Sequence, residues 1–381
     1  MDTTQIFDAA VIGGGPAGST SALHLARAGL NAAIIEKKIF PRETLCGEFI
    51  SREAVVILQG LELWDGFLTL CPNPIHSLKF IFKNGKTLKA PLFFTAYGLS
   101  RGAFDNFLLT QAVKEGATCF QPMEVKDVKR LNGLFHLALS GESQEELHAS
   151  HLIAAYGRQS PLDRVLNRNF AGIKSRINGV KLHIPAKYAP GFPEDEIHIY
   201  AGSGIYCGVN RVDNGIITVC FLEDRRGYEA SPKMHLKDLL IQNGSFKEIF
   251  SSEIFDLIDS LPVYGTGNIY FGRRNSVEHG VFMAGDTARV IAPLAGDGIA
   301  MALQSAGLAS EALIKLHRKE LSVPHAEEFY RLMWKRTFSR RIRHAGLIQK
   351  AVLNSALSLP AYAAGKMFPG ILQYLINSTR G

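Results

Sequence analysis

The first residues whose types and spacing suggest a chemical role are three glycines near the start of the chain. Gly13, Gly15 and Gly18 form a G-x-G-x-x-G pattern directly after the apolar run 9–12. Glycines at these positions allow a tight turn, close approach of the backbone to a diphosphate, and close packing of the next helix on the strand. Pro16 and Ala17 open that helix, whose N-terminus carries a partial positive charge. The segment therefore predicts a dinucleotide-binding site that includes all five residues.

An acidic residue occupies the position at which such a site binds ribose. Glu36 lies eighteen residues beyond Gly18, at the end of the next predicted strand, 32–35. A carboxylate there accepts hydrogen bonds from ribose hydroxyls and disfavours a 2′-phosphate. We assign Glu36 and its neighbour Lys37 to the cofactor site, because a merely tight turn does not explain the carboxylate.

A second glycine-rich segment lies far along the chain, after the apolar run 281–284. Its residues that we assign to a cofactor are Gly285, Asp286, Pro293, Gly296, Gly298 and Ile299. The aspartate can bind a polyol hydroxyl, as a ribityl chain requires, and the later glycines let backbone N–H groups approach the N1–C2=O edge of a flavin. A capping loop is the alternative explanation of these glycines. Because a nicotinamide domain needs only the first segment, the two segments together indicate FAD.

Composition places the chain among globular enzymes. It has 381 residues, of which 46% are hydrophobic and 20% charged, enough for two closely packed domains. The five cysteines are scattered and form no C-x-x-C pair, so we expect neither disulfides nor a metal site. The first residues lack the basic region of a signal peptide, and we therefore expect a cytoplasmic, reducing location.

Basic residues gather late in the chain. They are Arg331, Lys335, Arg336, Arg340, Arg341 and Arg343. A solvated helix face explains them most simply, and attraction to anionic lipid headgroups is the alternative. The apolar residues Leu353, Leu357, Leu359 and Ile371 that follow would suit peripheral contact with a membrane. We expect no nucleic-acid partner, because no nucleic-acid motif accompanies the charge.

The elements that must position these residues alternate between two periodicities. Residues 6–36 are predicted to form a strand–helix–strand unit, and helical patterns recur at 51–64, 99–115, 231–259 and from 298 onward. Residues 75–89 alternate with period two around Asn84-Gly85, which favours a type I′ hairpin. Strands are also predicted for the meander 124–153, with a turn at Asn132-Gly133, and for the segment 178–222.

This layout predicts an α/β fold. A Rossmann-type FAD-binding domain would comprise residues 1–74, 98–172 and 264–325. An interleaved antiparallel β-sheet substrate domain would comprise 75–97 and 173–263, and a C-terminal helical region would comprise 326–381. The inserted segments are too rich in strands to be crossovers of a parallel sheet, so we assign them to the second domain.

Two further segments carry a family resemblance. The chain resembles the p-hydroxybenzoate hydroxylase-type flavoproteins, and within them the geranylgeranyl reductase branch, from Phe7 to about Ala309. The segment from Arg42 to Cys46-Gly47-Glu48 is similar to the C-G-[DE] element near the flavin. The segment 101–108 is similar to the R-x-x-F-D-x-x-L helix. The resemblance implies that Arg42, Arg101 and Asp286 contact FAD, and that Cys46 and Gly47 lie beside it.

The sequence departs from the family pattern at two places. Ala155-Tyr156-Gly157 stands where the family usually has A-D-G, which disfavours NAD(P)H as the electron donor. The segment 206–210 stands where reductase relatives tend to have W-x-x-P. The W-x-W-x-I-P signature of flavin halogenases is absent, since Trp64 and Trp334 are the only tryptophans, so halogenation is not expected.

Four residues are candidates for chemistry on a substrate. Cys46 could donate a proton or pack against the substrate, and a small buried filler is the alternative. Glu48 could act as an acid if it is desolvated, and a helix cap is the alternative. His183 shares one strand face with Lys181, and a packed or surface histidine is the alternative. Tyr206 and Cys207 point to opposite faces, so at most one of them lines a pocket.

These observations and the resemblance together favour an FAD-dependent oxidoreductase that acts on a lipophilic, isoprenoid-like or polyketide-like small molecule. The leading hypothesis is reduction of a C=C bond by hydride from flavin N5, with a nearby acid that supplies the proton. One alternative is a monooxygenase that hydroxylates an aromatic or quinone-like substrate. The other is a non-catalytic flavin-binding or electron-relay protein.

Overall fold

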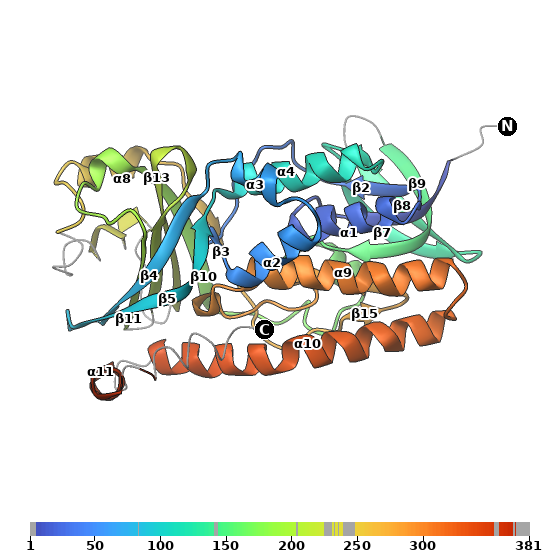
Figure 1. Ribbon diagram of the computed structural model, residues 1–381. Coiled ribbons are helices and arrows are strands. Elements are labelled where there is room, and N and C mark those ends of the chain that lie inside the picture. The colour runs from blue at the N-terminus through green and yellow to red at the C-terminus, as the bar shows by residue number, and fades with distance from the viewer. Residues whose placement is uncertain are drawn as a thin grey trace.

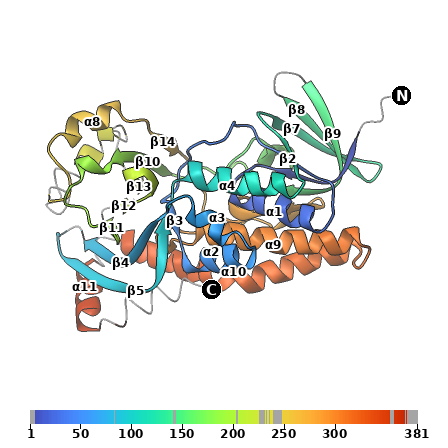
Figure 2. The same ribbon diagram turned by 45° about the horizontal axis from the view of Figure 1, so that its top comes forward.

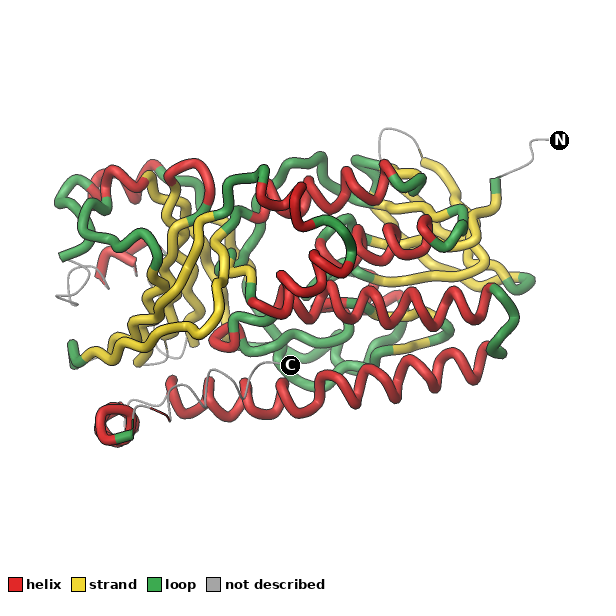
Figure 3. The backbone as a smooth tube through the Cα atoms, viewed as in Figure 1, coloured by secondary structure: helices red, strands yellow, loops and turns green. Residues whose placement is uncertain are grey.

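The computed structural model describes residues 5–82, 84–140, 144–202, 205–224, 231, 233–234, 236–238, 248–353, 358–368 and 370. Within these residues, strands form two sheets at the two ends of an elongated molecule, and helices lie between and beneath them (Figure 3). The predicted α/β architecture with an interleaved antiparallel sheet is confirmed. Of the apolar tail residues considered above, Leu357 and Ile371 lie outside the described residues.

The first sheet is built around β1 (Ile6–Ile12), which pairs in parallel with β2 (Ala32–Ile35) and β9 (Gln144–Ala154). The sheet continues through β6 (Thr118–Phe120) on one side and β16 (Val281–Met283) on the other, and β15 (Val277–Glu278) closes that edge. The central strands are buried on both faces, which explains their nearly continuous apolar runs. Their carboxyl ends share one edge of the sheet, where cofactors bind in folds of this type.

Helices cover one face of the first sheet and bring distant segments together. Helix α1 (Pro16–Arg27) packs between α4 (Arg101–Lys114) and α9 (Gly298–His317), as Figure 1 shows. Shorter helices are α2 (Arg52–Gly60), α3 (Trp64–Leu68) and α5 (Leu162–Val165). The helix predicted at 51–64 is therefore shorter than expected: α2 ends at Gly60, and the chain turns at Glu62, whose φ is 57°, before α3 begins.

A meander extends the first sheet. Strands β7 (Glu124–Leu131) and β8 (Leu134–Ser140) pair antiparallel with each other, and β8 pairs antiparallel with β9. The predicted turn at Asn132-Gly133 is confirmed, since both residues have positive φ between the paired Leu131 and Leu134. Phe135, Leu137 and Leu139 point inward and are buried, so the alternate positions face outward.

The second sheet is mostly antiparallel. Its order is β14 (Tyr264–Thr266), β10 (Ile177–Pro185), β13 (Ile216–Asp224), β12 (Ile205–Arg211), β11 (Glu196–Gly202), β4 (Asn73–Phe82), β5 (Thr87–Gly98) and β3 (Phe49–Ile50). One face packs against α8 (Ile254–Ser260), and the other faces the helices of the first sheet (Figure 2). β3 and β14 belong to this sheet, although the predicted boundaries place their residues in the cofactor domain; those boundaries stay predictions.

One expectation about a turn was wrong. Phe82 donates its backbone N–H to Lys86, so the loop between β4 and β5 is longer than a two-residue type I′ turn. The hairpin itself is present, and Gly85 supplies a positive φ of 78°. Of the helical pattern predicted over 231–259, the structure describes α8 near its end, and residues 232, 235 and 239–247 lie outside the described residues.

Two helices complete the chain below the sheets (Figure 1). α10 (Val323–Leu353) runs beside α9 and reaches the second sheet, and α11 (Ser358–Met367) lies near β5. Among the described residues, α9 is the one helix long and apolar enough to cross a membrane by length and composition. More than half of its apolar window (56%) is buried in the protein, where it packs on α1, so α9 is a core helix.

Candidate active site

A cavity of about 930 Å³ lies between the carboxyl edge of the first sheet and the inner face of the second sheet. Four of the segments that line it lie far apart in the sequence: the loop after β1, residues 42–49, the start of α4, and the region from β16 to the start of α9. Such a volume is at the upper end of the usual range for ligand sites, about 300–1,000 Å³. The cavity therefore has room for a large cofactor together with part of a substrate.

The first glycine segment forms one end of this cavity. Gly13, Gly15, Pro16 and Ala17 line it, and Gly13 has a φ of 104° that disfavours any other residue. Gly18 does not line the cavity. A Cβ atom on Gly18 would lie 1.7 Å from the carbonyl oxygen of Gly13, so this glycine lets α1 pack directly against the turn. The first turn of α1 consequently faces the cavity with its positive end.

The predicted ribose position is held by backbone N–H groups. Glu36 is 6% exposed, and its carboxylate accepts hydrogen bonds from the N–H of Gly14 at 2.7 Å and of Lys38 at 2.9 Å. Glu36 and Lys37 both line the cavity beside the glycine turn. A carboxylate has about four acceptor sites, so two remain for ligand hydroxyls. This geometry fits an adenosine ribose.

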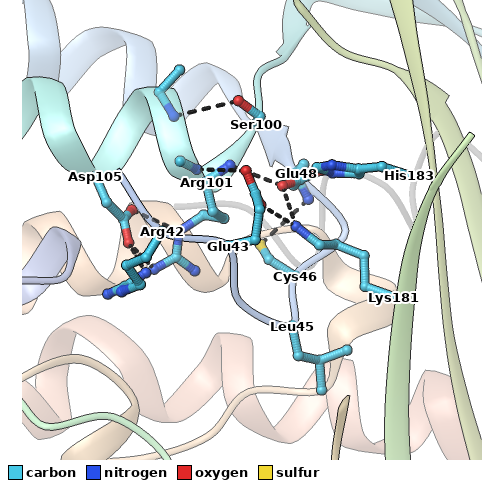
Figure 4. Close-up of polar contacts among 12 residues, drawn as sticks. Arg42, Glu43, Leu45, Cys46, Glu48, Ser100, Arg101, Asp105, Lys181 and His183 are labelled. Carbon is cyan, nitrogen blue, oxygen red and sulfur yellow. Dashed lines mark hydrogen bonds and ion pairs between the residues drawn. The ribbon is translucent and has the colours of Figure 1, made fainter. Parts of the chain in front are cut away.

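Two guanidinium groups stand above the turn and share one carboxylate (Figure 4). Arg42 donates to Asp105 at 2.7 Å, and Arg101 donates to both oxygens of Asp105, each at 2.7 Å. Their Nη2 atoms lie 3.7 and 3.8 Å, respectively, from the point where a Cβ on Gly15 would be. Burial alone would lower the pKa of Arg101, but the charge of Asp105 outweighs it and raises that pKa above its usual value. Two cations against one anion leave a net positive charge that suits a diphosphate.

The second glycine segment closes the cavity from the other side. Gly285 and Asp286 begin a single turn of 3₁₀ helix, and a Cβ on Gly285 would lie 2.8 Å from that of Ala17. Asp286 lies 3.6 Å from the guanidinium Nε of Arg158. Pro293 opens a second 3₁₀ turn, and Gly296, Gly298 and Ile299, the other predicted residues of this segment, also line the cavity. The two distant glycine segments thus face one space, as the sequence predicts.

Asp297 stands at the N-cap position of α9, but its side chain does not cap the helix. Its carboxylate instead accepts hydrogen bonds from Ser51 at 3.3 Å and from Arg341 of α10 at 3.1 Å. Ser51 is likewise the N-cap residue of α2 without a capping side-chain bond. These two N-cap side chains therefore share one buried contact that ties α2, α9 and α10 together, and neither caps its own helix.

A buried charged cluster lies next to the cavity, on the Cys46–Glu48 loop and β10 (Figure 4). Glu48 is fully buried and lines the cavity; its carboxylate lies 2.6 Å from the Lys181 ammonium and 2.6 Å from His183 Nε2. It also accepts the backbone N–H of Arg101 at 2.8 Å, so Glu48 caps α4 rather than α2. Lys181 makes a second hydrogen bond to Glu43. Lys181 and His183 thus share one strand face, as predicted.

Charge in this cluster fixes the state of Glu48. Burial would raise the pKa of its carboxyl, but the hydrogen bond from His183 and the charge of Lys181 outweigh burial and lower the pKa to about 2. Burial also opposes the charge of Lys181, yet Glu48 and Glu43 raise its pKa. Glu48 is therefore ionised at neutral pH, which disfavours it as the proton donor and makes it an acceptor that orients His183.

This arrangement predicts a loss of stability in acid. The pKa of Glu48 is about 2 in the folded chain and about 4.3 in an unfolded chain, so its stabilising effect is complete above pH 5 and is lost as the pH falls toward 2. We expect Glu48 to account for a decrease on the order of 3 kcal/mol in the free energy of unfolding. Urea unfolding at pH 7, 5 and 3 measures it.

Glu48→Gln is the variant for this test, because it should show a flatter pH dependence from a lower starting stability. Glu196 provides the comparison: burial raises its pKa, but hydrogen bonds from His198 and Lys89 lower it to about 2. Glu196→Gln should remove a separate part of the same slope. An unchanged slope in Glu48→Gln would contradict the assignment.

The other candidate residues differ in their access to the cavity. Cys46 lines it, and its Sγ accepts the backbone N–H of Glu48 at 3.3 Å. Tyr206 also lines it, whereas Cys207 points to the opposite face and is buried in the core beneath α8. His183 does not line the cavity and reaches it through Glu48. The prediction that Tyr206 and Cys207 point to opposite faces is confirmed.

Apolar side chains form the part of the cavity beneath the second sheet. Leu78 and Phe80 of β4 are in register with Ile197 and Ile199 of β11, so all four lie on one face. The wall continues with Phe82, Leu88, Leu92, Leu294 and Ile348. Cys46 and Glu48 lie where the polar and apolar parts meet, because they end the loop that leads into β3.

Sequence reasoning did not assign several cavity residues. Arg158 lines the cavity, donates to the backbone oxygen of Leu45 and lies near Asp286. Tyr156 occupies the position of the family's aspartate, and its hydroxyl donates to Asp163 at 2.8 Å. A phenol therefore replaces the carboxylate there. Arg158 directly follows the Ala155-Tyr156-Gly157 turn, and this position in the sequence could have indicated that it belongs to the site.

One group of potential metal ligands falls in this site. Ligand atoms of Glu43, Glu48 and His183 all lie within 4.8 Å of one another. The ammonium of Lys181 already lies between the two carboxylates and supplies the compensating positive charge. The absence of a metal here stays a prediction. The described contacts form a hydrogen-bonded network of two carboxylates, one ammonium and one imidazole.

Comparisons with known proteins agree with this geometry. The family model described as FAD binding domain matches residues 7–322. The chain is 26% identical over 355 residues to a 1H-pyrrole-2-carbonyl-[peptidyl-carrier protein] chlorinase of Pseudomonas fluorescens. The alignment covers 81% of this chain and 76% of the chlorinase. It is also 26% identical over 359 residues to digeranylgeranylglycerophospholipid reductase 2 of Methanopyrus kandleri, with 89% and 85% covered.

Solved structures show the same fold at low identity. A geranylgeranyl bacteriochlorophyll reductase-like protein of Thermoplasma acidophilum superposes with a TM-score of 0.77 at 20% identity, covering 98% of this chain and 100% of that one. A myxobacterial chondrochloren halogenase superposes with a TM-score of 0.78 at 18% identity, covering 98% and 91%. With the glycine turn, Glu36 and the arginine pair in one cavity, the chain belongs to the FAD binding domain family and is an FAD-dependent oxidoreductase.

Proposed function

We propose that this protein reduces C=C bonds of a lipophilic, isoprenoid-like substrate held in the apolar part of the cavity. The observation that carries the proposal is the continuous apolar wall of β4 and β11, which meets the FAD-binding end at Cys46 and Glu48. A hydrocarbon chain gains about 25 cal/mol per Å² on leaving water for such a wall. Similarity to digeranylgeranylglycerophospholipid reductases, which are named for reducing isoprenoid lipids, supports the same substrate class.

We further propose that the cofactor-site residues divide by part of FAD. The α1 turn with Arg42 and Arg101 would hold the diphosphate, Glu36 and Lys37 the adenosine side, and Asp286 the ribityl chain. Gly296, Gly298 and Ile299 would lie against the ring, where the N-terminus of α9 favours negative charge. Bound FAD supplies hydride from its reduced ring.

The remaining requirement of alkene reduction is one proton for the second carbon. We assign this proton to the Cys46 thiol, because it lines the cavity at the junction of the polar and apolar parts. After donation, the thiolate would be stabilised by the N–H of Glu48 and by the neighbouring charge of Arg101. Glu48 would hold the loop in place through Lys181 and His183, so it acts as a positioning residue.

Anaerobic single turnover tests the function. FAD-loaded protein is reduced with dithionite and mixed with a geranylgeranylated phospholipid, and flavin absorbance and product mass are followed. We expect reoxidation of the flavin together with a product that has gained two hydrogens for each double bond reduced. If no polyprenyl compound reoxidises the flavin, the reductase proposal fails.

An oxygen-using reaction is the second candidate, and the likeness to the chlorinase favours it. The same reduced protein mixed with oxygen and an aromatic or quinone-like compound would then yield a hydroxylated product. The absence of the W-x-W-x-I-P signature argues against halogenation itself. Reversible flavin reduction with turnover by neither route would instead favour the non-catalytic, electron-relay alternative.

We also propose that α10 contacts anionic membranes from which the substrate is drawn. Arg336, Arg340, Arg343 and Lys350 are exposed at spacings of three to seven residues. They share one helix face with the exposed Leu332 and Leu347, which are 56% and 61% exposed. Arg341 does not belong to this face, because it is buried and bound to Asp297. A basic face with exposed leucines suits an anionic lipid surface.

Neutralising two of these charges should weaken lipid binding. Each basic residue near an anionic surface contributes about 1 kcal/mol, so Arg336→Gln/Arg340→Gln should bind vesicles that contain phosphatidylserine about 30-fold more weakly. Co-sedimentation at low salt measures this. Lys174→Gln/Arg176→Gln is the matched control, since both residues are exposed but lie outside α10. Equal losses in the two variants would show only a general charge effect.

A further inference from the structure

Three metal-ligating side chains meet on the outer face of the meander, outside the flavin cavity. They are His136 of β8 and Glu146 and His148 of β9, and none of them lines the cavity. His136 is the direct cross-strand partner of His148, and Glu146 lies two residues before His148 on the same strand. All three side chains therefore project from the same face.

Distances within this group are close to those of a metal site. Oε1 of Glu146 lies 2.9 Å from Nδ1 of His136 and 3.2 Å from Nε2 of His148, and all three ligand atoms lie within 4.8 Å of one another. Zinc bonds of about 2.1 Å in tetrahedral geometry place ligand atoms about 3.4 Å apart. Shifts of about half an ångström would thus admit an ion. The imidazoles need only carry their protons on the opposite ring nitrogens.

His148 supplies an independent observation. Its Nε2 is fully buried and has no hydrogen-bond partner in the described structure, because its contact with Glu146 lacks hydrogen-bond geometry. A buried polar nitrogen without a partner costs free energy, and a metal bond would satisfy it. The His136 and His148 side chains are 22% and 17% exposed, while Glu146 is 56% exposed, so an ion can enter from solvent.

The surrounding charges permit a cation. Lys129 of β7 is the cross-strand neighbour of His136, but its ammonium is paired with Asp127 at 3.0 Å. The Glu146 carboxylate supplies a negative charge close to both imidazoles. Two imidazoles and one carboxylate suit zinc and neighbouring divalent transition metals better than magnesium or calcium.

We propose that His136, Glu146 and His148 bind a divalent transition-metal ion of the zinc class, with water in the remaining position. The ion joins β8 to β9, whose other end leads into the Ala155–Gly157 turn of the flavin cavity. Its role is structural, since the three ligands come from adjacent, continuously paired strands away from the cofactor. This site is independent of the proposed reductase activity.

Zinc titration of FAD-loaded protein, first stripped with EDTA, tests the site by calorimetry and thermal unfolding. We expect one ion bound with a dissociation constant in the micromolar range and a rise of a few degrees in Tm. His148→Gln should bind about a hundredfold more weakly and show no rise, because a first ligand is lost. His76→Gln, an exposed histidine elsewhere, should behave as the unchanged protein.

His136→Gln provides a second variant in case His148→Gln fails to fold, and retained FAD absorbance reports folding in both. X-ray absorption of the zinc-loaded protein should show two imidazole ligands with oxygen. Binding weaker than about 1 mM, far outside the range of structural zinc sites, would overturn the proposal. So would unchanged zinc affinity in both histidine variants, since the ion would then bind elsewhere.

Discussion

Gly18→Ala is expected to produce a protein that no longer binds FAD. The new methyl group would lie 1.7 Å from the carbonyl oxygen of Gly13 and 3.4 Å from the Cβ of Ala155. Contact below 3 Å with backbone cannot be relieved by a side-chain rotation, so α1 must move away from β1. That movement displaces the N–H groups of the turn from the diphosphate. We expect the FAD affinity to fall by at least about a hundredfold, because several charge-assisted hydrogen bonds are lost together.

The measurement is flavin absorbance of the purified variant, followed by titration of the apoprotein with FAD. Gly60→Ala is the matched control, because nothing lies within 4 Å of a Cβ at the last residue of α2. It should bind FAD normally and gain up to about 1 kcal/mol in stability from helix propensity. Unchanged FAD affinity in a folded Gly18→Ala protein would show that this close contact does not control cofactor binding.

Most of the fold could be predicted from local patterns in the sequence. The apolar runs that became β1 and β2, the small-residue helix α1 between them and the alternating residues of β8 and β9 are each decided by neighbours along the chain. Contacts between residues far apart in the sequence could not be predicted in this way. Ser51 and Asp297 have the sequence positions of helix caps, but their side chains bind each other across 246 residues of chain. A local cap rule cannot anticipate that competing partner.

The same distinction between local and distant contacts applies to the candidate site. Glu36, Gly285 and Asp286 were found because strand ends and glycine turns are local signals. Lys181 was noted only as a neighbour of His183, since a strand lysine usually faces solvent. Its complete burial depends on Glu43 and Glu48, more than 130 residues earlier in the chain. His136 and His148 likewise meet only through the register of β8 with β9.

Cys46→Ala is expected to slow alkene reduction by about 10²–10⁴-fold, the usual contribution of a positioned general acid. The substitution removes the thiol that lines the cavity and leaves the apolar wall and the glycine turn unchanged. FAD binding and reduction by dithionite should therefore remain normal. The rate of flavin reoxidation by a geranylgeranylated phospholipid, measured anaerobically, isolates the affected step. In D₂O the flavin N5–H and the thiol proton both exchange with solvent, so the unchanged protein should place one deuterium on each carbon of the reduced pair. Its solvent isotope effect should exceed that of the variant, which lacks proton transfer from the thiol.

Two further variants decide between proton donors. Cys71→Ala, at an exposed cysteine outside the cavity, should react at the normal rate. Tyr206 is the rival donor, because burial raises its pKa and keeps its hydroxyl protonated at neutral pH. If Cys46 donates, Tyr206→Phe should change substrate affinity more than the rate of reduction. If Cys46→Ala reduces the substrate at the normal rate and Tyr206→Phe reduces it slowly, Tyr206 is the proton donor. That result would leave Cys46 as a packing residue beside the flavin, since its contact with the Glu48 N–H would then have no thiolate to stabilise.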